Sequence, residues 1–193
     1  MELVIGTVTK VCSNARFAMT RYVAFLRAIN VGGRTVRMDA LRRQFETWGG
    51  SNVETFIASG NVVFDTARRS AEVIERSIEE HIRKALGYPV ITFLRTVPEL
   101  AAIAAHTPFS QDELDAGGTL FVGFMKSAPG PSVARAVAAL RNDVNDFAVR
   151  DRELYWLRRT QLMRSISSGP SMEKLVGSPI TMRNVNTVRR LAA

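Results

Sequence analysis

The stretch VETFIASGNVVFD, residues 53–65, places two short apolar segments on either side of a tight turn. The segments Val53–Ala58 and Val62–Asp65 are rich in β-branched and aromatic residues, which favour strands. The turn Ser59-Gly60-Asn61 suits a hairpin, because Gly and Asn adopt positive φ angles at little cost. We therefore predict an antiparallel hairpin at this point of the chain.

A helix is predicted on each side of this hairpin. The first begins at a capping Asp39 and ends at Gly49-Gly50, with its large apolar residues on one face. The second starts near Ser70 and combines an apolar stripe with Glu–Arg and Glu–Lys pairs four residues apart on its outer face. Strands at Tyr22–Ala28 and Val90–Arg95 complete the order βαββαβ, which is that of a ferredoxin-like unit.

The second half of the chain repeats this order less clearly. The capping box Thr96–Glu99 opens a connecting helix to about Ala105, and a polar linker follows. The remaining predicted elements are a strand, a helix with Leu140 on its apolar face, a hairpin, short helical turns and a last helix (Thr119–Lys126, from Pro131, Phe147–Arg150 with Leu154–Arg158, around Ser171–Val176, and from Asn184). The first strands of the two halves end alike, in Phe25-Leu26-Arg27 and Phe124-Met125-Lys126.

The resulting prediction is an α+β fold. Residues 19–105 form one ferredoxin-like unit with its connecting helix, and residues 106–193 form a second. Both units have antiparallel sheets, and their similar order indicates an internal duplication.

The charge of the chain is high and unevenly placed. The 193 residues include 26 Lys and Arg against 18 Asp and Glu, a formal net charge of +8. Because 22 of these bases are Arg, GC-rich codon usage alone can account for their type. Their position is more informative: residues 27–43 carry +4 and residues 152–193 carry +6, whereas the rest of residues 19–193 sums to −3. Basic segments of this kind favour an anionic partner such as nucleic acid.

Cysteine usage and hydropathy indicate a cytoplasmic protein. Cys12 is the only cysteine, which excludes an internal disulfide or a thiolate metal cluster. The sequence contains no apolar run of the roughly 18 residues that span a bilayer. Residues 1–18 do not match a signal peptide, and we expect them to be a disordered extension or the product of a mis-assigned start, with Met19 as the true start. No metal, cofactor or membrane partner is expected.

The loop Asn30-Val31-Gly32-Gly33-Arg34 is the first candidate site. It follows a predicted strand and precedes a predicted helix, where backbone N–H groups can hold an anion. It matches neither the P-loop nor the dinucleotide-binding motif. A plain turn, in which Asn30 bonds the backbone, is the alternative. The neighbouring Arg27, Arg34 and Arg37 keep the anion interpretation open.

Four further residues are candidates. Asn61 either closes the hairpin turn or points its amide into a cleft. Asn184 fits a helix N-cap, with Asn186 in the first turn. Arg183 directly precedes them, and a cation beside a helix N-terminus opposes the helix dipole. That position suits an anionic ligand shared by the guanidinium and the helix N–H groups.

Three segments of the chain resemble one bacterial family. Tyr22–Gly33 (YVAFLRAINVGG), Ser59–Phe64 (SGNVVF) and Thr181–Val188 (TMRNVNTV) are similar to the marks of the family called domain of unknown function 1697, and Tyr155-Trp156 fits it as well. The resemblance covers nearly the whole chain, from Met19 to Leu191. It implies a pair of ferredoxin-like units and no established biochemical activity.

Two functions follow as hypotheses. The first is a non-catalytic binder of nucleic acid or of a phosphorylated small molecule in a cleft between the two units, with a site formed by Arg27, Asn30, Gly32, Gly33, Arg34, Asn61, Arg183, Asn184 and Asn186. The second is a small-molecule enzyme in the same cleft, in which Arg and Asn stabilise a developing oxyanion. For the enzyme, the sequence offers only carboxylates such as Asp39 or Asp65 as a general base.

Overall fold

The computed structural model describes residues 18–27, 29–30, 33, 35–57, 60–68, 70–115, 117–159 and 169–193. The expected disorder of residues 1–18 thus falls almost entirely outside the described residues. Within the described part, no helix is both long and apolar enough to cross a membrane.

The first half of the chain forms a four-stranded antiparallel sheet with the strand order β2-β3-β1-β4. Its elements are β1 (Thr20–Leu26), α1 (Met38–Trp48), β2 (Ser51–Phe56), β3 (Asn61–Thr66), α2 (Ala71–Leu86), β4 (Thr92–Thr96) and α3 (Val97–Ala105).

The second half forms another four-stranded antiparallel sheet, with the order β6-β7-β5-β8. Its elements are α4 (Gln111–Asp115), β5 (Thr119–Phe124), α5 (Pro131–Ala138), β6 (Asn145–Arg150), β7 (Glu153–Arg158), α6 (Gly169–Val176), β8 (Thr181–Asn184) and α7 (Val185–Ala192). The predicted α+β class is confirmed, and the two sheets connect their strands in the same order.

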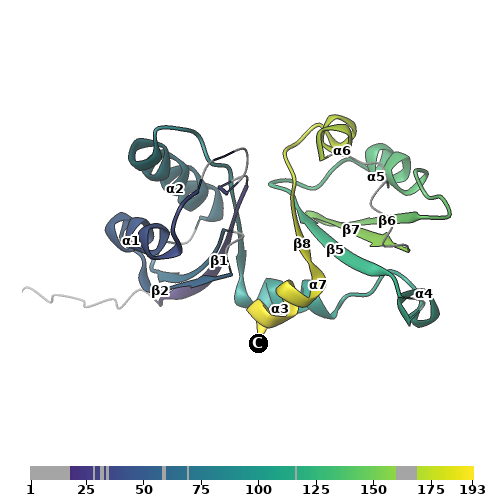
Figure 1. The fold of residues 1–193 in the computed structure, drawn as a ribbon, viewed down its shortest axis with the longest axis horizontal. Helices are drawn as coiled ribbons and strands as arrows, with labels where there is room; N and C mark the ends of the chain where they lie inside the picture. The colour runs from purple at the N-terminus through teal and green to yellow at the C-terminus, as the bar shows by residue number, and fades with distance from the viewer. Residues whose placement is uncertain are drawn as a thin grey trace, which may run out of the picture.

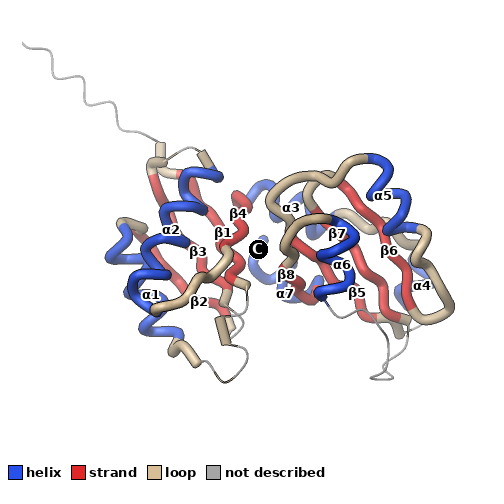
Figure 2. Tube along the Cα trace, turned by 90° about the horizontal axis from the view of Figure 1, so that it is seen from above, coloured by secondary structure: helices blue, strands red, loops and turns tan. Residues whose placement is uncertain are grey.

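The two sheets face each other, and helices cover their outer faces (Figures 1 and 2). In β1, Tyr22, Ala24 and Leu26 pack with α1 and α2, whereas Val23 and Phe25 pack toward the second sheet. Because both faces of this strand are buried, its sequence is a nearly continuous apolar run. The helices α3 and α7 pack together between the sheets.

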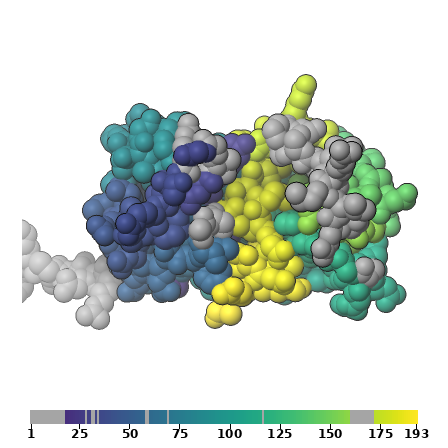
Figure 3. Space-filling model, in the orientation of Figure 1, coloured from purple at the N-terminus to yellow at the C-terminus, as the bar shows by residue number. Residues whose placement is uncertain are grey.

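We call the contact between the inner faces of the two sheets the seam. Its apolar part comprises residues of both sheets and of α3 and α7, among them Val23, Phe25, Val63, Phe93, Val122, Phe124 and Val188. Figure 3 shows the C-terminal segment, in yellow, lying between the first and second halves of the chain.

Several helix ends confirm the sequence analysis. The hydroxyl of Ser70 accepts a hydrogen bond from the Val73 N–H, and Thr96 and Glu99 form the predicted capping box. Gly49 ends α1 with a φ of 110°. The N-cap of α1, in contrast, was assigned wrongly: it is Arg37, without a side-chain cap, and Asp39 lies in the first turn.

Three other details differ from the prediction. The strand β8 was not expected, because its four residues TMRN have no apolar pattern and take strand geometry from pairing with β5. The predicted polar linker contains the short helix α4. Leu140 lies beyond the end of α5 and is 44% exposed, because the helix ends at Ala138.

Candidate functional site at the seam

Two buried arginines occupy matching positions in the two sheets. Arg183 in β8 and Arg95 in β4 each directly precede the N-cap residue of the next helix, which is Asn184 for α7 and Thr96 for α3. Their exposed fractions are 8% and 1%. Both side chains therefore lie within the seam. Arg183 also directly precedes the N-cap of α7, so its predicted place beside a helix N-terminus is confirmed.

The guanidinium of Arg183 joins the two halves of the chain. Its Nε donates to Asn61 Oδ1 at 2.6 Å, and an Nη donates to the carbonyl of Leu26 at 3.1 Å. The other Nη donates to Thr181 Oγ1 and to the carbonyl of Met182, within the second half. Burial lowers the pKa of Arg183 to about 10, so the side chain is charged at neutral pH.

Arg95 belongs to the first half of the chain and makes the corresponding contacts with the second half. Its Nε donates to Glu153 Oε1 at 2.7 Å, and an Nη donates to the carbonyl of Met125 at 2.9 Å. The other Nη donates to the carbonyl of Leu94, as Arg183 does to its own preceding residue. Burial lowers the pKa of Arg95, and the Glu153 carboxylate opposes that shift.

The strand register shows that these positions are equivalent. Asn61 pairs with Phe25 across β3 and β1, and Glu153 pairs with Phe124 across β7 and β5. The two phenyl rings stack on each other, with centroids 4.0 Å apart. Arg183 lies over the ring of Phe25, and Arg95 lies over that of Phe124. The main chemical difference is the acceptor of the Nε hydrogen bond, an amide in one case and a carboxylate in the other.

A second pair of contacts crosses the seam in the same reciprocal way. Arg27, after β1, contacts Glu173 of α6 at 2.9 Å. Lys126, after β5, contacts Glu79 of α2 at 2.6 Å. Each carboxylate also accepts a backbone N–H, from Ile180 for Glu173 at 2.9 Å and from Thr92 for Glu79 at 2.8 Å. Each half thus reaches the other through a cation at the end of its first strand.

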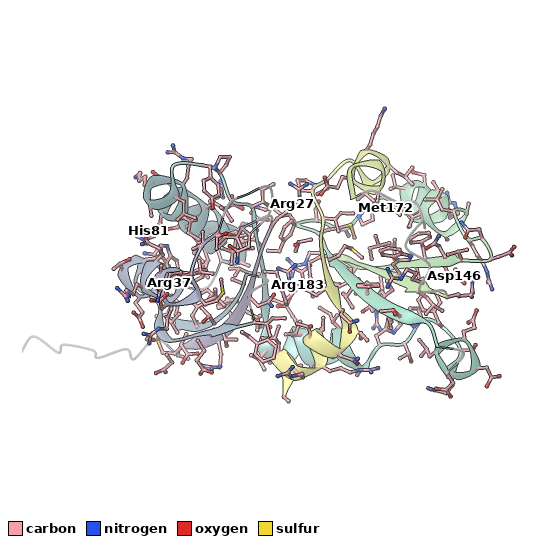
Figure 4. The ribbon with its side chains drawn as sticks, in the orientation of Figure 1. Arg27, Arg37, His81, Asp146, Met172 and Arg183 are labelled. Atoms are coloured by element: carbon pink, nitrogen blue, oxygen red, sulfur yellow. The ribbon has the colours of Figure 1, made fainter. Side chains whose placement is uncertain are left out.

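The structure brings together three of the predicted site residues. Arg27, Asn61 and Arg183 lie at the seam, and Figure 4 shows Arg27 and Arg183 between the halves, with Arg37 farther out on the first. Asn30 accepts a hydrogen bond from the Val36 N–H at 2.7 Å and so closes its loop. Gly33 has a φ of 80°. Gly32 and Arg34 lie outside the described residues.

Asn184 and Asn186 lie elsewhere. They line a separate pocket of about 370 Å³ together with Arg189 and residues of α4. Asn184 accepts a hydrogen bond from the Asn186 N–H at 2.8 Å, which confirms it as the N-cap of α7. An anion shared between this helix terminus and Arg183 is therefore not supported, because the Arg183 guanidinium is directed into the seam.

Four residues at the seam were not predicted from the sequence: Arg95, Glu153, Glu173 and Glu79. The similarity between Phe25-Leu26-Arg27 and Phe124-Met125-Lys126 was the available signal. The same alignment of the two halves pairs Asn61 with Glu153 and Arg183 with Arg95. It therefore identifies the residues whose contacts across the seam are equivalent. The carboxylates of Glu79 and Glu173 carry no such signal, because a Glu on a predicted helix is usually exposed to solvent.

These features define a class of protein: an α+β chain with two four-stranded antiparallel sheets that meet at a partly polar, buried seam. The chain belongs to the family described as "Protein of unknown function (DUF1697)", whose profile matches residues 19–155.

The chain is also similar to the solved structure of SP0830, a conserved bacterial protein from Streptococcus pneumoniae. The TM-score is 0.68 at 21% sequence identity, and the match covers 91% of this chain and 98% of that one. At this identity the likeness shows the fold alone. The comparison with curated proteins found no match.

Proposed function

We propose that the chain is a non-catalytic binder of an anionic ligand, either nucleic acid or a phosphorylated small molecule. The proposed site lies at the seam, at the end of β1, and consists of Arg27 together with the hydrogen-bonded pair Asn61 and Arg183. All three family-like segments reach this point, through the Leu26 carbonyl, the Asn61 amide and the Arg183 guanidinium.

The observation that carries the proposal is the exchange of a carboxylate for an amide. In the second half, the buried Arg95 meets Glu153, so the pair is neutral. At the equivalent position the Arg183 Nε donates to the amide oxygen of Asn61, a neutral acceptor in place of the carboxylate. A charge held in a medium of low dielectric acts strongly on nearby ions. The Arg183 guanidinium therefore attracts an anionic ligand to this end of β1.

Arg27 makes the site accessible. Its side chain is 35% exposed and directly follows Leu26, whose carbonyl accepts the hydrogen bond from Arg183. The two cations therefore lie at the same end of β1. Both also belong to the basic segments 27–43 and 152–193, which the fold joins at the seam.

The carboxylates considered for an enzyme lie away from this point. Asp39 is on α1, on the outer side of the first sheet, and contacts Arg37 and Arg43. Asp65 is four residues from Asn61 along β3, about 13 Å at the rise of a strand, and contacts Arg21. This separation favours binding over oxyanion catalysis.

We also propose that the two halves are ferredoxin-like units formed by duplication. The shared strand order and the reciprocal contacts of Arg95 and Arg183 support this relation. The single cysteine supports a reducing, cytoplasmic location.

Binding is tested by fluorescence anisotropy with labelled single-stranded DNA and RNA across a salt series. A nucleic-acid binder shows a log–log slope of about −0.7 for each phosphate neutralised. Thermal shift with pyrophosphate and nucleoside phosphates tests the small-molecule form. The absence of both salt-dependent binding and a thermal shift contradicts the proposal.

A pair of variants locates the site. Asn61→Asp places a carboxylate against Arg183, so we expect a folded protein that binds the anion at least about tenfold more weakly. Asn186→Asp makes the same change of charge in the pocket beside α7, and we expect it to bind as the unmodified chain does. If only Asn186→Asp weakens binding, the ligand binds in the pocket beside α7 and the proposed site at the seam is wrong.

A further inference from the structure

A pocket of about 250 Å³ lies between α3 and the β6–β7 hairpin, so both halves of the chain contribute to it. Its charged lining consists of Arg95, Glu99, Arg150, Asp151, Arg152 and Glu153. Its volume is close to the lower limit for small-molecule sites, and pockets between domains are frequent ligand sites. The pocket adjoins Arg95 and is distinct from the proposed anion site at Arg183.

The charges around this pocket are balanced and arranged in pairs. Arg95 contacts Glu153 at 2.7 Å, and Arg152 contacts Glu99 at 3.0 Å. The third pair, Arg150 and Asp151, is looser at 3.8 Å. The three guanidinium groups and three carboxylates sum to zero. The lining therefore favours a ligand that carries charges of both signs over one with a net charge.

The pocket combines a fixed floor with an adjustable rim. Arg95 and Glu153 are buried and held by further hydrogen bonds, so their positions are set by the fold. At the rim, Asp151 has an 82% exposed side chain and Arg150 is exposed as well. Exposed ion pairs contribute little to stability, so a ligand can replace one at little cost.

An apolar wall completes the pocket. It consists of Ala102 and Ile103 of α3 and of the Tyr155 ring. The Tyr155 hydroxyl donates to the carbonyl of Ile103 at 3.4 Å, and burial raises the pKa of this hydroxyl to about 12, so it stays protonated. The wall can therefore contact the carbon skeleton of a ligand whose charged groups face the rim.

We propose that this pocket binds a small zwitterion with one carboxylate and one ammonium group, the chemistry of a free α-amino acid. The ligand carboxylate binds at Arg150 and Arg152. The ammonium binds at Glu99 and Asp151, and the side chain lies against Ile103. This site is independent of the proposed function at Arg183.

His106 provides a local reporter. Its Nδ1 lies 2.8 Å from a guanidinium nitrogen of Arg150, and its ring meets the edge of Tyr155 with centroids 5.0 Å apart. Burial lowers the pKa of His106, and the charge of Arg150 adds to this effect. The other histidine, His81, contacts Gln44 and Thr47 on the outer side of the first half, far from the pocket (Figure 4).

The test is an NMR titration of the full-length chain that follows the two imidazole signals. Each standard amino acid is added in turn, at up to millimolar concentration. We expect at least one to move the His106 signals saturably and to leave the His81 signals in place. No movement with any amino acid overturns the proposal.

Matched analogues separate a zwitterion site from a simple anion site. If L-leucine binds, for example, 4-methylpentanoate lacks its ammonium and 3-methylbutylamine lacks its carboxylate. We expect each analogue of the bound amino acid to bind at least about tenfold more weakly. Equal binding of the carboxylate analogue contradicts the proposal.

The variant Asp151→Asn tests the ammonium contact. Asp151 has a φ of 51°, and Asn adopts this conformation readily, so the turn is preserved while its charge is removed. We expect binding at least about fivefold weaker. Asp143→Asn, the same change on an exposed loop, is the control and leaves binding unchanged. If Asp151→Asn and Glu99→Gln both bind as the unmodified chain does, the assignment is wrong.

Discussion

The buried pair of Arg95 and Glu153 supports the sharpest prediction about the seam. Three variants separate the contributions of this pair to the free energy of unfolding. Glu153→Gln keeps an oxygen acceptor for the Arg95 Nε and imitates the amide that Arg183 meets in the other half. Glu153→Ala removes the acceptor. Arg95→Met removes the cation and its donors together.

The structure sets the expected order of the losses. A hydrogen bond to a charged group contributes about 1.5–3 kcal/mol and a neutral one about 0.5–1.5, so Glu153→Gln costs about 1–2 kcal/mol. Glu153→Ala breaks a buried ion pair and costs about 3–5 kcal/mol. Arg95→Met also leaves the carbonyls of Leu94, Met125 and Arg152 without this donor, so we expect a loss at least as large.

Urea denaturation at neutral pH, followed by tryptophan fluorescence, measures these losses as changes in the free energy of unfolding. Glu80→Gln is the control, because it disrupts an exposed pair with Lys84, and we expect its midpoint to match that of the unmodified chain. A loss below about 1 kcal/mol for Arg95→Met refutes the reasoning, since such a value means that the buried guanidinium does not hold the halves together.

Further predictions concern a helix cap, a glycine and a carboxylate. Asn184→Ala removes the side-chain cap of α7, and we expect it to lower the free energy of unfolding in urea by about 1 kcal/mol. Gly123→Ala places a Cβ 2.6 Å from the sulfur of Met182, and we expect a loss of about 1–3 kcal/mol, whereas Gly130→Ala meets no atom within 4 Å and changes stability much less. A hydrogen bond from the Arg159 side chain lowers the pKa of Glu113 from 4.5 to about 2. Its stabilising effect is therefore complete above pH 4.5 and is lost as the pH falls through about 2, which a carboxyl NMR titration detects; titration near pH 4.5 contradicts the assignment.

The sequence was most informative where structure is local. The strands β2 and β3 lie on either side of Gly60, at the expected place, and the cap at Ser70 and the capping box at Thr96 mark the starts of α2 and α3. These features depend on residues within a few positions of each other, so propensity and spacing are sufficient. The strand β8 depends instead on pairing with β5, about sixty residues earlier, and the sequence of TMRN does not indicate it.

The same distinction between local and long-range features applies to the candidate site. Asn61 and Arg183 were identified from their positions beside a turn and a helix, but their hydrogen bond joins residues 122 positions apart. Asn184, selected for the same site, is a helix cap in a different pocket. Glu153, the partner of Arg95, was not predicted, because a polar residue at the start of a strand is usually exposed. It is buried here because the two sheets pack against each other.

The assignment of Arg183 as the anion-binding cation is tested most directly by NMR of the arginine Nε–H groups. Arg183 and Arg95 are matched, and both Nε–H groups are hydrogen-bonded within the seam, so one serves as the control for the other. Single-stranded DNA or pyrophosphate is added until binding, followed by anisotropy or thermal shift, is saturated. We expect the Arg183 signal to move in step with saturation while the Arg95 signal stays in place. Saturated binding with an unmoved Arg183 signal contradicts the assignment.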